Sequence, residues 1–332
     1  MFPRTTVLST AAVTVATSAA VLLSTGAAAT PAATPGATPS PGAAPSATPG
    51  WQQAGDDITS GISGLALADG PHGSHGSGGV AHALVVRDNK KPGQNRVGEL
   101  SYRPGRSAHI EPLAWADGAE PIDLEAIEAV PGASDEFVAL ASRGLVYHLK
   151  VRGSEAHVLD TSPLPAIAEG DDYESFALTS RHGRMAAVWA DRGAGKERPA
   201  TVHAAPFSFN EYDEAEFGRV STTRLRAPYP TGAVRHASDI SVTDSGRLLV
   251  SSASDVGDDG PFDSAVMDAG TLSVNRSGKI RLSVAKHPDV LRKFKGHKIE
   301  AVECAPGSGP AVLGTDDENA GGYVNSADLC GR

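Results

Sequence analysis

The sequence has few cysteines, few aromatic residues and a shortage of basic charge. Its 332 residues include two Cys, three Trp, six Tyr and eight Phe, and 29 Lys and Arg stand against 39 Asp and Glu, for a net charge of −10. That deficit disfavours a nucleic-acid-binding protein, which usually carries a net basic footprint. The shortage of aromatic residues does not exclude a folded core, because 40% of the residues are hydrophobic, with Ala and Val prominent.

Familiar catalytic motifs are also missing. The chain has no G-x-S-x-G nucleophile elbow, no H-E-x-x-H zinc helix and no P-loop. These absences argue against the hydrolases, metalloproteases and nucleotide-binding proteins that depend on such motifs. Functional residues must therefore be sought among side chains that the fold brings together.

The first fifty residues differ from the rest of the chain. Arg4 is the only charged residue before Trp51, and an apolar stretch from Val7 to Leu23 leads into small residues that end at Ala29. This order is typical of a secretory signal peptide, and no basic stop-transfer residues follow that would favour the alternative, a retained membrane anchor. The sequence predicts a signal peptide at 1–29, a disordered Ala/Thr/Pro/Gly linker at 30–50, and an extracellular domain at 51–332 with no membrane span after cleavage.

The two cysteines, Cys304 and Cys330, both lie near the C-terminus. In the oxidising compartment expected for an exported protein, a disulfide is the default for such a pair. A metal-binding pair or a catalytic thiol is the alternative.

An internal repeat organises the domain. The segment 123–131 matches 298–306 residue for residue, and weaker copies occur at 62–67, 172–179 and 237–243. Each copy is followed by a turn-rich stretch and a short, β-branched apolar run, which indicates strands. A short helical turn is expected only after Pro288, which suits a first helical position.

Counting strands predicts the fold class. The first four repeats each contain four expected strands, the last contains three, and Trp51 to Ile58 can supply the missing one. Four-stranded units repeated radially and closed by strands from both termini describe an all-β protein, a β-propeller. Five four-stranded blades are favoured and six are the alternative, with the ring closed by the N-terminal strand in the last blade.

Antiparallel pairing places one set of charged residues at one mouth of this ring. Each first strand begins, and each second strand ends, at the same edge of its sheet. The aligned entry positions are Glu125, Glu174 and Glu300, with Ser63 and Ser238 completing the circle, and Asp316 and Asp317 follow the last second strand. Oxygen ligands of this kind suit Ca²⁺, or less readily Mg²⁺. The alternative is that these carboxylates are solvated or accept backbone hydrogen bonds.

Basic residues are expected at the same mouth. A set of carboxylates and cations suits an anionic, oxygen-rich substrate such as a phosphate ester. Charge compensation on an acidic surface is the alternative for each residue. The candidate substrate-binding residues are Arg143, Arg235, His236, Lys295 and Lys298.

Two segments carry a family resemblance. They resemble the repeats of secreted bacterial phytase-like propellers. The first segment is Asp123 to Ile127, and the second is Lys298 to Val302 together with the strand end at Leu313 to Asn319. Ala126 and Ala301 stand where that family has Gly. The resemblance implies a calcium-dependent phosphoesterase, with the glutamates on the metal and the basic residues on phosphate.

Two hypotheses of different classes follow. The first is a secreted calcium-binding propeller that acts as a metal-dependent phosphoric ester hydrolase on a small anionic substrate. The second is a non-catalytic extracellular propeller that binds a ligand or protein and holds a structural ion. In both hypotheses the protein is a monomer and binds no nucleic acid.

Overall fold

The computed structural model describes residues 50–67, 80–305 and 309–331, all of which belong to one compact unit, Ala44–Arg332. The predicted signal peptide, and the predicted linker apart from Gly50, lie outside the described residues. The described residues form strands and one short 3₁₀ helix, η1 (Glu318–Ala320). None of their helices is long and apolar enough to cross a membrane.

The strands form successive antiparallel units of four, as the repeat predicts. Within each unit, most strands pair with their neighbours in sequence, so local turns set the register of these pairs. Blade 1 comprises β2 (Gly64–Leu67), β3 (Ala81–Val86), β4 (Val97–Arg103) and β5 (Ser107–Trp115). Blade 2 comprises β6 (Leu124–Ala129), β7 (Glu136–Ala141), β8 (Leu145–Arg152) and β9 (Glu155–Pro163). A short parallel pairing of β5 with β9 joins these two blades at their outer edges.

The later units follow the same plan. In blade 3 the outer edge is shared by two short strands that both pair with β12, and in blade 5 the last position is filled from the N-terminus. Blade 3 comprises β10 (Tyr173–Arg181), β11 (Arg184–Asp191), β12 (Ala200–Phe209), β13 (Ala215–Phe217) and β14 (Ser221–Leu225). Blade 4 comprises β15 (Val234–Val242), β16 (Arg247–Ser254), β17 (Asp263–Val274) and β18 (Ile280–Lys295). Blade 5 comprises β19 (Ile299–Cys304), β20 (Ala311–Thr315), β21 (Tyr323–Ala327) and β1 (Gln52–Gln53).

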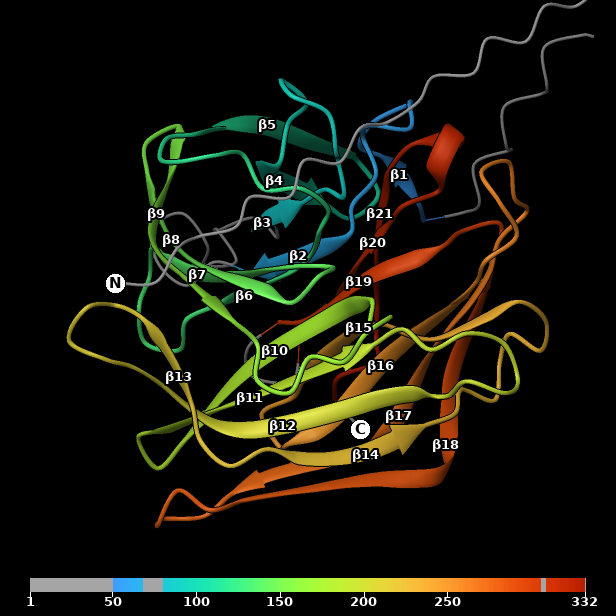
Figure 1. The fold of residues 1–332 in the computed structure, drawn as a ribbon. Coiled ribbons are helices and arrows are strands. Elements are labelled where there is room, and N and C mark those ends of the chain that lie inside the picture. The colour runs from blue at the N-terminus through green and yellow to red at the C-terminus, as the bar shows by residue number, and fades with distance from the viewer. Residues whose placement is uncertain (1–49, 68–79, 306–308, 332) are drawn as a thin grey trace, which may run out of the picture. The chain divides into compact units, whose positions relative to one another are not determined.

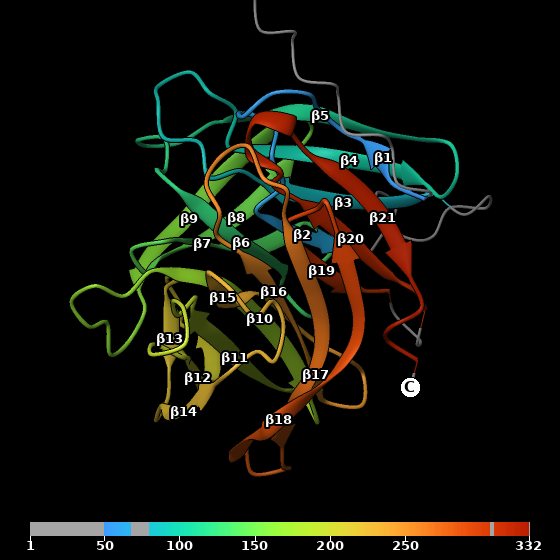
Figure 2. The same ribbon diagram turned by 90° about the vertical axis from the view of Figure 1, so that its right-hand side faces the viewer.

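The blades close into a ring through five hydrophobic cores. Each cluster of buried side chains is shared by two neighbouring blades, and the last cluster joins blade 5 to blade 1. Blades packed on both faces need apolar side chains on both faces, so adjacent residues such as Ala126 and Ile127 belong to different cores. The first strands contact one another in the order β2, β6, β10, β15, β19 and back to β2. Figure 1 shows these strands innermost, with β5, β9, β14 and β18 outermost, and Figure 2 shows the same order after a quarter turn. The β-propeller prediction is confirmed.

Both ends of the domain are fastened in the last blade. β1 pairs with β21 through Gln52 and Gln53, as expected for closure by the N-terminal strand. Cys304 and Cys330 form the predicted disulfide, which links the end of β19 to the C-terminal segment.

The expected helical turn after Pro288 is wrong. Residues 289–292 belong to β18 and continue its pairing with β17. Pro288 lacks the N–H that a ladder requires, and it lies in a four-residue interruption of the pairing, between Val284 and Asp289. The strand resumes beyond it because β17 still offers an unpaired edge.

Candidate functional site

Three glutamates converge at one end of the ring because each occupies a β-bulge. The pairing of β6 with β7 jumps between Leu124 and Ala126, and the same irregularity occurs around Glu174 in β10 and Glu300 in β19. A bulged residue leaves the ladder, and its side chain is re-aimed. The three side chains are buried, and one carboxylate oxygen from each lies within 4.8 Å of the others.

These glutamates line a cavity of about 350 Å³ whose described lining residues are all charged. Eight acids meet five bases, so the lining keeps an excess of three negative charges when every group is ionised. The acids are Asp88, Asp123, Glu125, Asp172, Glu174, Glu300, Asp316 and Glu318, and the bases are Lys90, Arg143, Arg192, Arg235 and Lys298.

Arg235 lies three residues before Ser238, the entry position of blade 4, and contributes a cation to the cavity. Its Nη1 lies 3.5 Å from Glu174 Oε2 and 3.1 Å from Glu300 Oε1, so one guanidinium bridges blades 3 and 5. Its Nη2 lies 3.3 Å from Asp255 Oδ1. Glu174 also accepts from Arg192 Nη1 at 3.3 Å. The cation therefore offsets part of the repulsion between the converging glutamates.

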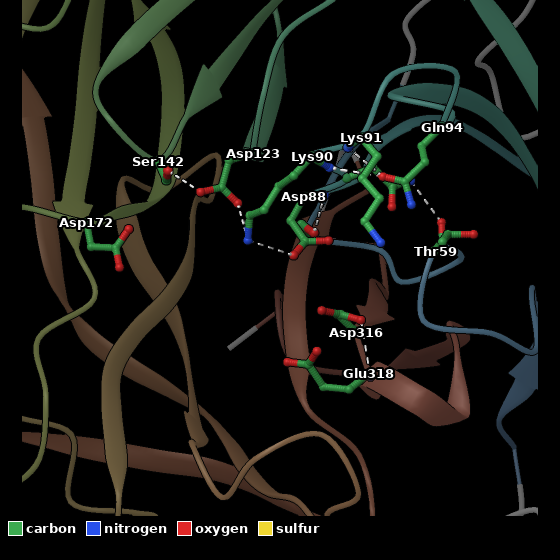
Figure 3. A network of polar contacts seen from close by, with 12 residues as sticks. Thr59, Asp88, Lys90, Lys91, Gln94, Asp123, Ser142, Asp172, Asp316 and Glu318 are labelled. Carbon is green, nitrogen blue, oxygen red and sulfur yellow. Dashed lines mark hydrogen bonds and ion pairs between the residues drawn. The ribbon is translucent and has the colours of Figure 1, made fainter. Parts of the chain in front are cut away.

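Lys298 supplies the second buried cation. Its Nζ lies 2.9 Å from Glu300 Oε1 and 3.6 Å from Asp316 Oδ2, and it also pairs with Glu318. Opposite these residues, Lys90 lies 2.8 Å from Asp123 Oδ1 and 3.7 Å from Asp88 Oδ2. Figure 3 shows the Lys90 ammonium between the two aspartates and Ser142 donating to Asp123.

Glu125 differs from the other two converging glutamates in its partners. Among the described residues, no cationic side chain forms an ion pair with it, and burial followed by the charges of Glu174 and Glu300 raises its pKa well above the ordinary value. Burial also raises the pKa of Glu174 to about 7, against the opposing effect of Arg235. The pKa of Asp316 is likewise raised, by burial and then by Glu300. The cavity will thus take up protons or another cation.

The donor set fits a hard divalent cation. The three converging glutamates offer oxygen only, with no sulfur or nitrogen ligand among them, and their neighbourhood has uncompensated negative charge. Calcium accepts six to eight such oxygens in flexible geometries. The residues that would hold it are Glu125, Glu174 and Glu300.

Three predicted site residues lie outside this cavity. Asp317 accepts from His297 Nδ1 and from the backbone N–H of Lys298, both at 2.6 Å. His236 is buried between Ala227 N and Gly195 O, at 3.0 and 2.7 Å. Lys295 is exposed, pairs with Asp263 at 2.7 Å and covers the ring of Tyr229. Their polar atoms serve local structure.

The other predicted residues all line the cavity: Glu125, Glu174, Glu300, Asp316, Arg143, Arg235 and Lys298. Sequence reasoning did not assign Asp123 and Asp172, although the signal was present. Both stand two residues before an entry glutamate, at the position of the repeat where Lys298 stands before Glu300. Lys90 had no such signal, because it lies in a loop outside the repeat.

No protein-family model and no curated protein matches the chain. Several solved structures align with most of it. The glutaminyl cyclase of Myxococcus xanthus is 11% identical, covers 83% of this chain and 92% of its own, and gives a TM-score of 0.41. An exo-1,5-α-L-arabinanase from a bovine ruminal metagenomic library is 8% identical over 80% of this chain and 93% of its own, with a TM-score of 0.47. A GH43 β-1,3-galactosidase is also 8% identical, over 80% and 90%, with a TM-score of 0.44. We draw no functional argument from similarity at this level.

Proposed function

We propose that this protein is a secreted, calcium-binding β-propeller that hydrolyses a phosphate or related anionic ester in the charged cavity. The observation that carries the proposal is the convergence of three buried glutamates, one of them without a cationic partner among the described residues, beside basic groups in one cavity. Secretion accords with the disulfide, because disulfides persist in oxidising compartments. A phytase-like substrate remains the prediction from the sequence motifs.

The chain's own residues supply distinct parts of this chemistry. Without a bound cation, Glu174 has a pKa of about 7 and can exchange a proton close to neutral pH, whereas as a cation ligand it would stay ionised. Arg143 and Arg192 line the same cavity and can donate charge-assisted hydrogen bonds to anionic oxygens. A bound divalent cation would polarise a phosphoryl oxygen.

The first test measures cation binding apart from activity. Calcium is titrated by calorimetry into the mature protein and into Glu125→Gln, and the melting temperature is followed with and without the ion. We expect the wild-type protein to bind Ca²⁺ and to be stabilised by it, whereas Glu125→Gln loses about tenfold or more in affinity because one anionic ligand is gone.

Glu128→Gln is the matched control, because Glu128 is also a buried glutamate of β6 but lines a different cavity. It should keep the affinity of the wild-type protein.

Hydrolysis of p-nitrophenyl phosphate is then assayed with and without Ca²⁺. Absence of calcium binding would overturn the cation site, and calcium binding without turnover would overturn the enzymatic part alone.

A second candidate function rests on a different observation. Among the described residues, four of the six exposed large hydrophobic side chains lie in connections at the same end of the blades, and Leu145 begins β8 at that end. Exposed apolar side chains that form one patch are typical of a surface that meets a partner. In a non-catalytic propeller, these residues would contact an extracellular ligand while any ion served stability. They are Ile58, Ile122, Leu145, Ile167 and Val256.

A further inference from the structure

Two edge segments of blades 3 and 4, around β14 and β18, have a charge opposite to that of the whole chain. Segments 219–226 and 279–295 contain nine Lys and Arg residues and one acid, Asp289, which leaves 20 basic and 38 acidic residues elsewhere. The two segments include the edge strands β14 and β18, which pack against each other. Positive charge is therefore gathered in one region of an acidic protein.

A cleft of about 430 Å³ opens between these two strands. Arg224 and Arg226 line it from blade 3, Lys286 and His287 line it from blade 4, and no described acidic residue lines it. Three prolines complete its walls and restrict the backbone there. They are Pro199, Pro228 and Pro288.

The interruption in β18 builds one side of the cleft. Pairing with β17 runs to Val284 and resumes at Asp289, so residues 285–288 leave the ladder. Because Pro288 has no N–H to donate, the segment loses little by leaving the sheet. Lys286 and His287 are carried into the cleft by this excursion.

The basic side chains of the cleft are available to a ligand. Arg224, Arg226 and Lys286 are exposed, and none forms an ion pair with an acid among the described residues. Arg226 donates to the backbone carbonyl of Lys196, a neutral acceptor. Their charge is therefore not cancelled within the domain.

Protection of the sheet edge does not explain the sign of this charge. Charged residues on an edge strand deter pairing with other chains, and either sign serves that purpose. The outer strands of blades 1 and 2, which pair with each other only through residues 114–115 and 155–156, carry Glu111 and Asp160. On β18, in contrast, exposed Arg281, Arg292 and Lys293 continue the positive charge on both sides of the cleft.

We propose that the cleft between β14 and β18 binds a linear polyanion, a polymer with repeated phosphate or carboxylate groups. Guanidinium pairs such as Arg224 and Arg226 match the geometry of both groups. The basic strand beyond the cleft extends contact to neighbouring units of an elongated ligand. This site shares no lining residue with the charged cavity and does not depend on the function proposed for it.

The test uses fluorescently labelled polyphosphate and polygalacturonate, with anisotropy measured at low and at raised salt. The wild-type protein should bind at least one polymer, more weakly at raised salt because screening shortens the reach of the charges. A variant with three charge reversals in the cleft should lose affinity by about tenfold or more. The reversals are Arg224→Glu, Arg226→Glu and Lys286→Glu. If this variant loses binding to only one of the two polymers, the anionic group of that polymer is the one that the cleft recognises.

The control combines three charge reversals at the ends of the β4–β5 and β8–β9 hairpins, where they change the net charge equally. They are Arg103→Glu, Arg106→Glu and Arg152→Glu. Affinity in this control should stay within about twofold of the wild type. A milder set, Arg224→Gln with Arg226→Gln, keeps the test valid if the charge-reversed cleft variant fails to fold. Equal losses in cleft and control variants would overturn the proposal. So would binding of neither polymer, or a dimer of this chain that dissociates when the cleft is altered.

Discussion

Glu125, Glu174 and Glu300 show how one residue type acquires different properties from its neighbours. Glu300 contacts both Arg235 and Lys298, Glu174 contacts Arg235 and Arg192, and Glu125 has no cationic partner among the described residues. Burial, followed by the charges of Glu174 and Glu300, raises the pKa of Glu125 well above its ordinary value, and burial opposed by Arg235 raises the pKa of Glu174 to about 7. The three glutamates share a position in the repeat, but their cationic partners differ: Arg192 comes from the same blade as Glu174, whereas Arg235 comes from blade 4.

Stability should depend on pH through Glu174. Its pKa rises from 4.5 to about 7 on folding, so between these values the folded state binds the proton that the unfolded state has lost. In the absence of divalent cations, the stability contributed by Glu174 is therefore fully present below pH 4.5 and is lost as the pH rises towards 7, by up to about 3 kcal/mol. Urea unfolding across this range provides the measurement.

Glu174→Gln should flatten that part of the curve, because the variant has no proton to lose. Glu169→Gln, at an exposed position, serves as the control and should keep the wild-type slope. An unchanged slope in Glu174→Gln would contradict the assignment. Calcium should also reduce the slope if the ion is bound at the glutamates.

At the scale of the element, β-bulges decide which residues face the charged cavity. Leu124 and Ala126 pair with successive residues of β7 and pack into two different interblade cores. Glu125, the extra residue between them, leaves the ladder, and its side chain lines the charged cavity. Equivalent bulges in β10 and β19 repeat the arrangement, which is why an alignment of sequence repeats located all three glutamates.

The disulfide should stabilise the last blade measurably. Cys304 and Cys330 are 26 residues apart, and closing a loop of that size lowers the entropy of the unfolded chain. Replacing both cysteines by serine should lower the free energy of unfolding by about 3 kcal/mol. Denaturant titration with and without reductant tests this, since reductant should destabilise only the wild-type protein. Equal sensitivity of both proteins to reductant would refute it.

At the scale of the whole molecule, ring closure depends on a short segment from the N-terminal side. Trp51 precedes β1 and is buried in the core between blades 4 and 5. Its ring lies 6.0 Å from that of Phe294 and 4.3 Å from that of His297. Because β1 contains only two residues, this packing contributes more to closure than the two-residue pairing does.

Trp51→Ala should therefore lower the free energy of unfolding by about 3 to 5 kcal/mol, through lost burial and a residual cavity. Chemical denaturation followed by circular dichroism is the measurement. Tyr212→Ala removes a largely exposed aromatic side chain and should change stability by less than about 0.5 kcal/mol. Comparable losses in the two variants would show that Trp51 has no special part in closure.

The sequence by itself determined most of the strands, their grouping into blades, the closing strand, the disulfide and the shared position of the three glutamates, but not the course of β18 beyond Pro288. Repeats, turn residues and apolar runs are local signals, and antiparallel pairing converts them into a common edge. Only the tertiary structure decided which charges meet. Arg235 bridges two other blades, whereas His236, its neighbour in sequence, is turned into local hydrogen bonds. Such partners come from different blades, so their contacts depend on bulges and interblade packing that no single repeat encodes.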